Sequence, residues 1–281
     1  MSSYSSAIST MGTILVAMAF FAAVEAMLPL HARGAWGRRH LGPNLLLTFV
    51  TFATNAVFNV GLVLLLERQE IAGVGLLRMY GVPYVPATVA VVLALDFANY
   101  LAHVGMHASP VLWRFHSVHH SDPAVDVTTT IRQHPGEGVI RYVVLAVAAC
   151  GIGATPAAFA VYRAWSVLHG LLEHANVRVP SRLDAIVSWV VTTPNMHKVH
   201  HSRRVEETNS NYGNIFALFD RWFSTFTPTD RGLRVAYGLD GLDEQSVQTT
   251  AGLLALPFRG ALASPDATVP NAVVARAPRS S

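Results

Sequence analysis

The sequence predicts an all-α membrane protein, a multi-pass bundle of membrane helices that carries a histidine-rich helical cap on its cytoplasmic face. One observation behind this is low charge: 52% of the 281 residues are apolar and 13% are charged, whereas a soluble domain has about 25% charged residues. Another is that eleven of the thirteen histidines fall between His103 and His201. A chain this apolar is also unlike a disordered one, which is poor in apolar residues.

The rest of the composition excludes several other classes of protein. Cys150 is the single cysteine, so the sequence has no disulfide framework, no cysteine-based zinc ribbon and no cysteine-ligated iron–sulfur cluster. The net charge of +3 is small, and no basic stripe interleaved with aromatic residues is present. Both features argue against nucleic-acid binding.

The first predicted membrane helix covers residues 11–30, an apolar run interrupted only by Glu25 and long enough to cross about 30 Å of hydrocarbon. No charged residue precedes Glu25, whereas a signal peptide begins with a basic region. Three arginines follow within residues 31–40, and by the positive-inside rule they mark a cytoplasmic loop. The second predicted span is 45–66, and the connection 67–82 is expected on the opposite side.

The third helix is expected to open at Pro83 and Pro86, since proline is tolerated in a first helical turn. Residues 84–107 would reach about 36 Å at 1.5 Å per residue. The end of this helix, with His103 and His107, is therefore expected to emerge from the membrane on the cytoplasmic side.

A fourth apolar region, residues 139–168, is interrupted by glycines and a proline near its middle. This pattern predicts a hairpin of two short helices that enters the membrane and returns. Residues 108–138 and 171–234 are polar enough to lie in water and form the cap. The expected organisation is N-terminal membrane helices in 1–82, a histidine-bearing domain in 83–234, and a C-terminal tail in 235–281 that is largely disordered.

Ten of the histidines form four groups along the chain. Positions i, i+3 and i+4 of a helix share a face, so each H-x-x-H-H element directs three imidazoles toward one spot and H-x-x-x-H directs two. Ten imidazoles exceed the needs of one metal ion and suit two ions with open positions for oxygen and water. Metal binding also keeps clustered imidazoles neutral, which removes their mutual repulsion. The predicted ligands are His103, His107, His116, His119, His120, His169, His174, His197, His200 and His201.

The chemistry of the donor atoms favours iron. Imidazole accepts zinc, copper, iron and nickel. Structural zinc closes a four-coordinate site, and catalytic zinc typically uses three protein ligands, so ten nitrogens exceed both needs. Iron that activates dioxygen fits this donor set best. His31 and His40 lie outside the groups and are expected to be structural.

Three segments resemble the fatty acid hydroxylase/sterol desaturase superfamily, whose members are integral-membrane di-iron enzymes. The resemblance covers about residues 90–230 and implies a di-iron catalytic domain within 83–234. The segments that carry it are Asp96-Phe-Ala-Asn-Tyr100-x-x-His103-x-x-x-His107, Leu112-Trp-Arg-Phe-His-Ser-Val-His-His120 and Asn195-Met-His-Lys-Val-His-His201, with Asn211-Tyr-Gly-Asn214 and Asp220-Arg-Trp-Phe223 downstream.

The resemblance assigns the ligand role to the eight histidines of these motifs, and it matches His169 and His174 by their position between the second and third motifs. The sequence departs from the pattern at Val104, because many members have arginine directly after the first histidine. This departure bears on the subfamily more than on the chemistry.

Four further residues are candidates for supporting roles. Asp96 lies two helical turns before His103 on the same face, where a carboxylate would orient a ligating imidazole; the alternative is an acid paired elsewhere in the bundle. His134 is expected near the site without ligating, and a membrane segment follows it too closely for a cytochrome b5 haem motif. Asn176 either supports the site or caps a helix. Arg163 either faces a lipid head group or pairs with an acid.

The function that the resemblance implies is O2-dependent hydroxylation of a lipid, such as a fatty acyl chain or a sterol, by two iron ions. The sequence has no glycine-rich dinucleotide loop, so electrons are expected from a separate ferredoxin, cytochrome or reductase. Desaturation of a similar lipid is an alternative that the motifs do not separate. A histidine-rich metal transporter is a more distant alternative, because a transporter holds its ligands at the bilayer midplane.

Overall fold

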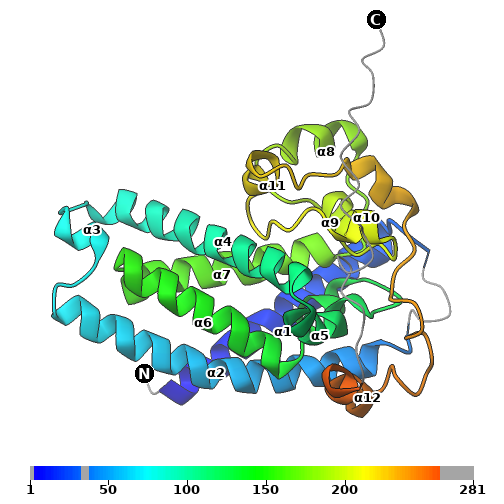
Figure 1. Ribbon diagram of the computed structural model, residues 1–281, viewed down its shortest axis with the longest axis horizontal. Helices are drawn as coiled ribbons and strands as arrows, with labels where there is room; N and C mark the ends of the chain where they lie inside the picture. Colours follow the sequence, from blue (N-terminus) through cyan, green and yellow to red (C-terminus); the bar gives the residue numbers. More distant parts are fainter. Residues whose placement is uncertain (1–2, 33–37, 260–281) are drawn as a thin grey trace, which may run out of the picture.

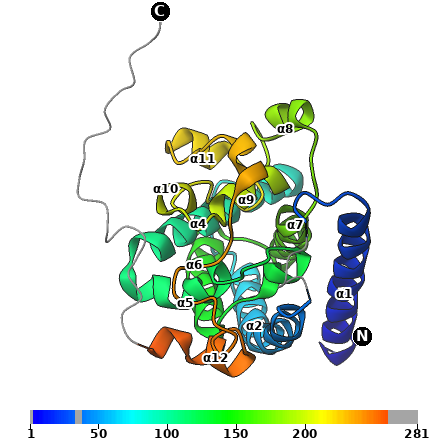
Figure 2. The same cartoon turned by 90° about the vertical axis from the view of Figure 1, so that its right-hand side faces the viewer.

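The computed structural model of the protein describes residues 3–32 and 38–259, and these residues form helices and connecting loops with no strands. The prediction of an all-α fold is therefore confirmed. Four long helices run side by side along the length of the molecule, and the first helix packs against their side (Figures 1 and 2). These helices are α1 (Ser3–Met27), α2 (Leu41–Ile71), α4 (Tyr84–Ala108), α6 (Pro135–Ile152) and α7 (Pro156–His174).

Three stretches within the described residues are long and apolar enough to cross a membrane: Leu41–Met79, Tyr84–Ala108 and Pro135–Ile152. They confirm the multi-pass bundle. The apolar part of α1, Met11–Met27, is shorter than these, so a crossing by α1 stays a prediction, as does the cytoplasmic orientation of the cap.

The predicted hairpin is present as α6 and α7. Gly153 ends α6 in a left-handed conformation (φ 77°), and Thr155 then caps α7 by accepting a hydrogen bond from the Ala158 amide. The turn packs closely against the connection between α2 and α4, because a Cβ added at Gly75 would lie 2.3 Å from the Cα of Gly153. Backbone contact at this distance requires glycine on both sides.

A continuous apolar core joins the long helices. Most of its fully buried members come from α2, α4, α6 and α7, which fixes the helices to one another. They include Leu66, Leu95, Ala149, Phe159 and Tyr162. Because α4 and α7 also carry histidines of the predicted site, this core sets the distance between two parts of that site.

Short helices gather at one end of the bundle and form the cap, whereas α3 (Leu76–Met79) lies at the other end (Figure 1). The cap consists of α5 (Pro110–His120), η1 (Val127–Ile131), α8 (Ser181–Val187), α9 (Pro194–His200), α10 (Val205–Thr208), α11 (Leu218–Trp222), η2 (Thr229–Arg234), α12 (Thr250–Ala255) and η3 (Leu256–Phe258).

The end of the described chain differs from the disordered tail expected over 235–281. Leu253 and Leu256 are buried against α2 and α5, and Gln248 accepts a 2.7 Å hydrogen bond from the guanidinium of buried Arg132. Residues 235–259 are therefore part of the fold. The composition of this segment did not indicate an ordered structure, because the segment has little helical pattern of its own. A few apolar contacts and one buried hydrogen bond hold it in place. Residues 260–281 lie outside the described part.

Candidate metal centre

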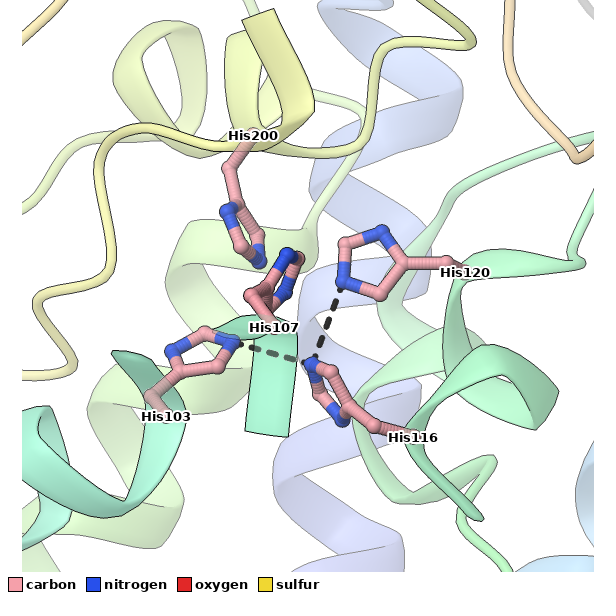
Figure 3. Close-up of side chains that lie close together, drawn as sticks. All are labelled: His103, His107, His116, His120 and His200. Carbon is pink, nitrogen blue, oxygen red and sulfur yellow. Dashed lines mark hydrogen bonds between the residues drawn. The ribbon is translucent and has the colours of Figure 1, made fainter. Parts of the chain in front are cut away.

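Nine histidine side chains meet at the junction of the bundle and the cap. They form two adjacent clusters, and within each cluster one nitrogen from every ring lies within 4.8 Å of the others. All nine rings are buried. Figure 3 shows the rings of the first cluster pointing toward one another. The five-histidine cluster contains His103, His107, His116, His120 and His200; the four-histidine cluster contains His119, His174, His197 and His201.

Each H-x-x-H-H motif contributes to both clusters. In α5, His116 and His120 enter the five-histidine cluster and His119 enters the other. In and after α9 the assignment is reversed: His197 and His201 enter the four-histidine cluster, and His200 enters the five-histidine cluster. The two i, i+4 histidines of each helix stand one above the other, while the histidine at i+3 turns to the neighbouring cluster. The three imidazoles of one motif therefore point into two adjacent clusters, and not toward one spot as expected from the sequence.

The spacing of the ring nitrogens fits a metal ion. The Nε2 atom of His174 lies 3.0 Å from Nε2 of His119, 3.0 Å from that of His197 and 3.3 Å from that of His201. A ring nitrogen carries either one hydrogen or one lone pair, so hydrogen bonding satisfies one of these contacts at most. Ligands about 2.1 Å from a single ion stand roughly 3.0–3.4 Å apart, which matches the arrangement.

Outward-facing ring nitrogens are held by backbone oxygens. His103 Nδ1 lies 2.8 Å from the Tyr212 carbonyl oxygen, and His200 Nδ1 lies 2.8 Å from that of Ser210. A carbonyl oxygen only accepts, so Nδ1 carries the hydrogen in both rings and the Nε2 lone pair faces the cluster. The loop after α10 therefore fixes the tautomer of two predicted ligands.

Two buried glutamates that sequence reasoning did not single out flank the clusters. Oε1 of Glu137 lies 3.0 Å from Nδ1 of His116, and Oε2 of Glu173 lies 3.8 Å from Nδ1 of His197. A carboxylate beside the outer nitrogen orients a ligating imidazole and increases its basicity. The sequence feature that could have identified these glutamates is an acidic residue within an apolar helix, because such a residue is a candidate functional residue.

His119 and His200, one histidine from each cluster, are neutral at ordinary pH. Burial lowers the pKa of His119 to about 3, and burial lowers that of His200 to about 4. Their lone pairs are therefore available to a metal ion without competition from protons at neutral pH.

The tenth predicted ligand, His169, lies outside both clusters. Its Nε2 atom is 2.8 Å from Oγ1 of Thr192, whose hydroxyl in turn donates to Glu173. The five-residue spacing from His169 to His174 explains this placement, because positions i and i+5 do not share a helical face.

The other candidates contact parts of the scaffold. Asp96 accepts hydrogen bonds from the Ile215 and Phe216 amides and from Asn214, so it holds the loop between α10 and α11 rather than an imidazole. The Arg163 guanidinium lies 5.3 Å from the centre of the Tyr142 ring.

His134 and Asn176 each tie a distant segment to the bundle. Nε2 of His134 lies 3.2 Å from the Leu254 carbonyl oxygen near the end of the described chain. Asn176 binds the backbone of His31 through both its amide oxygen and its amide nitrogen. Neither residue is among the groups around the two clusters.

The comparison with known families agrees with this geometry. Residues 88–225, which contain all nine clustered histidines, match the sequence profile of the fatty acid hydroxylase family. This region of the chain belongs to the fatty acid hydroxylase family. It covers most of α4, the α6–α7 hairpin and the cap as far as α11, while α1 and α2 lie outside the match.

The names of the curated relatives of this chain describe enzymes that act on lipids. The ornithine lipid hydroxylase OlsE of Rhizobium tropici is 33% identical over 160 residues, which is 56% of this chain and 47% of OlsE. Alkylglycerol monooxygenase of Xenopus tropicalis is 31% identical over 52% of this chain and 31% of its own length. The Caenorhabditis elegans alkylglycerol monooxygenase is 30% identical over 51% and 28%. The matches thus span less than half of each relative. No solved structure gives a significant match to the chain.

Proposed function

We propose that this protein is a membrane-bound, O2-dependent di-iron hydroxylase of a lipid. The observation that carries the proposal is the pair of adjacent, buried histidine clusters on a bundle with three membrane-spanning stretches. The reaction replaces a C–H bond by C–OH and consumes O2, two electrons and two protons, with water as the second product. Two iron ions held by the nine histidines would supply the activation of dioxygen.

The chain contributes the position of the ligands and the exclusion of water. Rings from α4, α5, α7 and α9 converge in a site where all nine are buried, so the imidazoles need little rearrangement to bind metal. The carbonyl oxygens of Tyr212 and Ser210 keep the protons of His103 and His200 on the outer nitrogens. The Glu137 carboxylate lies 3.0 Å from the outer nitrogen of His116 and places a negative charge beside that ring.

The substrate is proposed to be a membrane lipid with a fatty acyl, alkyl or sterol portion. The names of the relatives, which mention ornithine lipid and alkylglycerol, support this class. The clusters lie at the end of membrane helices, where a lipid reaches them from the bilayer. Electrons are proposed to come from a separate ferredoxin, cytochrome or reductase, and the cap is proposed to face the cytoplasm.

Purified protein in nanodiscs, loaded with iron and supplied with a reductant, O2 and total membrane lipid, tests the proposal. We expect about two iron ions per chain and a lipid product heavier by one oxygen. His119→Ala and His200→Ala, which each remove a ligand from a different cluster, are expected to abolish the product, and Glu206→Gln in the exposed part of the cap is the control. Full turnover by either histidine variant would refute the di-iron site.

The mass of the product also separates the alternatives. A lipid lighter by two hydrogens identifies a desaturase with the same metal centre. Metal movement across a vesicle membrane without lipid oxidation identifies a transporter, which the position of the clusters at the end of the spans disfavours.

A further inference from the structure

One side of the cap exposes large apolar side chains. They belong to α8, the residues after it, and α11, two segments that lie along the same edge of the molecule in both views (Figures 1 and 2). Their exposed fractions range from 52 to 72%. The side chains of this apolar edge are Leu183, Ile186, Trp189, Val190, Trp222 and Phe223.

Backbone contacts join the two segments of the apolar edge into one surface. The Ala217 amide donates to the Val190 carbonyl oxygen at 3.0 Å, and the Arg221 guanidinium donates to the Ser188 carbonyl oxygen at 2.9 Å. A contiguous exposed apolar patch of this kind marks an interaction surface.

The depth of the apolar edge follows from its contacts with the membrane helix α4. The Phe97 ring centre lies 5.1 Å from that of Phe219 and 5.6 Å from that of Phe223. Phe97 is thirteen residues beyond Tyr84, or about 20 Å along the helix, whereas the hydrocarbon layer is about 30 Å thick. A bilayer that begins at Tyr84 therefore extends about 10 Å past Phe97, and α11 lies beside it rather than above it.

Two further contacts hold the apolar edge at this depth. Asp96, next to Phe97, binds the backbone of Ile215 and Phe216. The Phe216 ring in turn lies 5.5 Å from Trp165 of α7, which is 42% exposed on the outside of the bundle. The apolar edge is thus continuous with the outward-facing surfaces of α4 and α7.

The residue types also match the boundary of a bilayer. Tryptophan is enriched at the level of the lipid head groups, and Trp189 and Trp222 are among the most exposed side chains of the apolar edge. The Arg221 guanidinium lies 3.9 Å from the ring centre of Trp189, and arginine covers apolar surface with its stem while its charge remains near phosphates.

We propose that the apolar edge is embedded in the head-group and upper acyl region of the membrane, so that the cap rests partly in the bilayer beside α4 and α7. The proposal depends on the membrane-spanning bundle and is independent of the reaction that the metal centre performs. It commits the surface to lipid, and a protein partner at the same place is a competing outcome.

Nitroxide-labelled single-cysteine variants of the full chain in phosphatidylcholine–phosphatidylglycerol nanodiscs test the depth. On a Cys150→Ala background, Ile186→Cys and Trp222→Cys report on the apolar edge. Val147→Cys, on the exposed side of α6, serves as the lipid reference, and Glu206→Cys on the cap serves as the water reference. Power saturation compares collisions with O2, which dissolves in lipid, and with a water-soluble nickel complex.

We expect the ratio of O2 to nickel collisions at positions 186 and 222 to exceed that at 206 by several-fold and to approach that at 147. A ratio equal to that at 206 shows a water-exposed surface and overturns the proposal. Low access to both reagents shows a covering protein and also overturns it. The unsubstituted protein provides an independent check: diazirine-labelled phosphatidylcholine should form adducts within 182–190 and 218–223, and their absence there contradicts the proposal.

Discussion

The Nδ1 atom of His116 lies 3.0 Å from Oε1 of Glu137, and both side chains are fully buried. Glu137 also binds the Arg141 guanidinium at 2.9 Å, so this carboxylate links an arginine of α6 to a ligand of the five-histidine cluster. Groups that orient metal-binding histidines typically change metal affinity about 10- to 100-fold when they are removed.

Glu137→Gln is therefore expected to weaken metal binding at the five-histidine cluster by about 10- to 100-fold, because a neutral amide no longer places a negative charge beside an imidazole that would bind a cation. The four-histidine cluster should keep its ion. Metal retained per chain during titration with a chelator measures this, and Glu206→Gln is the matched control. Equal loss of metal from both clusters, or none from either, would contradict the assignment.

His174→Ala and His169→Ala are expected to differ in metal content, although both histidines lie on α7. The His174 ring meets three other Nε2 atoms in the four-histidine cluster, whereas His169 binds Thr192. We expect His174→Ala to lose about one ion per chain and His169→Ala to keep both. Metal analysis after gel filtration distinguishes them, and loss of an ion from His169→Ala would restore it as the tenth ligand.

Asp96→Asn is expected to lower the stability of the protein by about 1–3 kcal/mol, since one buried acceptor oxygen is replaced by a donor facing backbone amides. Asp96 accepts from Asn214 at 3.2 Å, from Ile215 at 3.2 Å and from Phe216 at 2.9 Å. The midpoint of thermal unfolding in detergent measures the effect, with exposed Asp240→Asn as the control. Unchanged stability would show that the loop is held by other contacts.

His40→Gln is expected to remove a pH-dependent part of the stability. Burial alone lowers the pKa of His40, but the Asp122 and Asp126 carboxylates outweigh it and raise this pKa to about 10. The folded state therefore holds the proton more tightly than the unfolded state, whose value is about 6.5. The advantage of the native protein over His40→Gln should be full below about pH 6.5 and disappear as the pH rises toward 10.

Thermal unfolding midpoints of both proteins between pH 6 and 10 measure this difference. A difference that is constant with pH would mean that His40 is neutral in the folded protein. The His40–Asp122 pair lies at the start of α2, where His40 Nδ1 is 3.0 Å from Asp122. Because His40 belongs to neither histidine cluster, the metal content of His40→Gln is a separate readout.

The histidine spacing was sufficient to predict which histidines on α4, α5 and α9 share a helical face and can gather in clusters, because i, i+3 and i+4 relations are local properties of a helix. The sequence could not predict that His119 and His200 lie in opposite clusters from the other histidines of their motifs, since this depends on how α5 and α9 cross in space. Glu137 was overlooked for the same reason: its partner His116 lies on another helix, and only packing brings the two together.

The membrane helices were predicted from apolar length, which is also local. The roles of Asp96 and His134 were not, because their partners at Phe216 and Leu254 are 120 residues away in each case. The sequence left open whether Asp96 orients an imidazole or is paired elsewhere in the bundle, and the fold gives it distant backbone partners.

The reversed contribution of the two H-x-x-H-H motifs has a consequence for biosynthesis. Both clusters take ligands from α5 and from the segment that ends at His201, so neither is complete while the ribosome is still translating α7. A chain that ends before residue 197 would therefore leave both clusters incomplete rather than one of them, because each would lack at least one histidine.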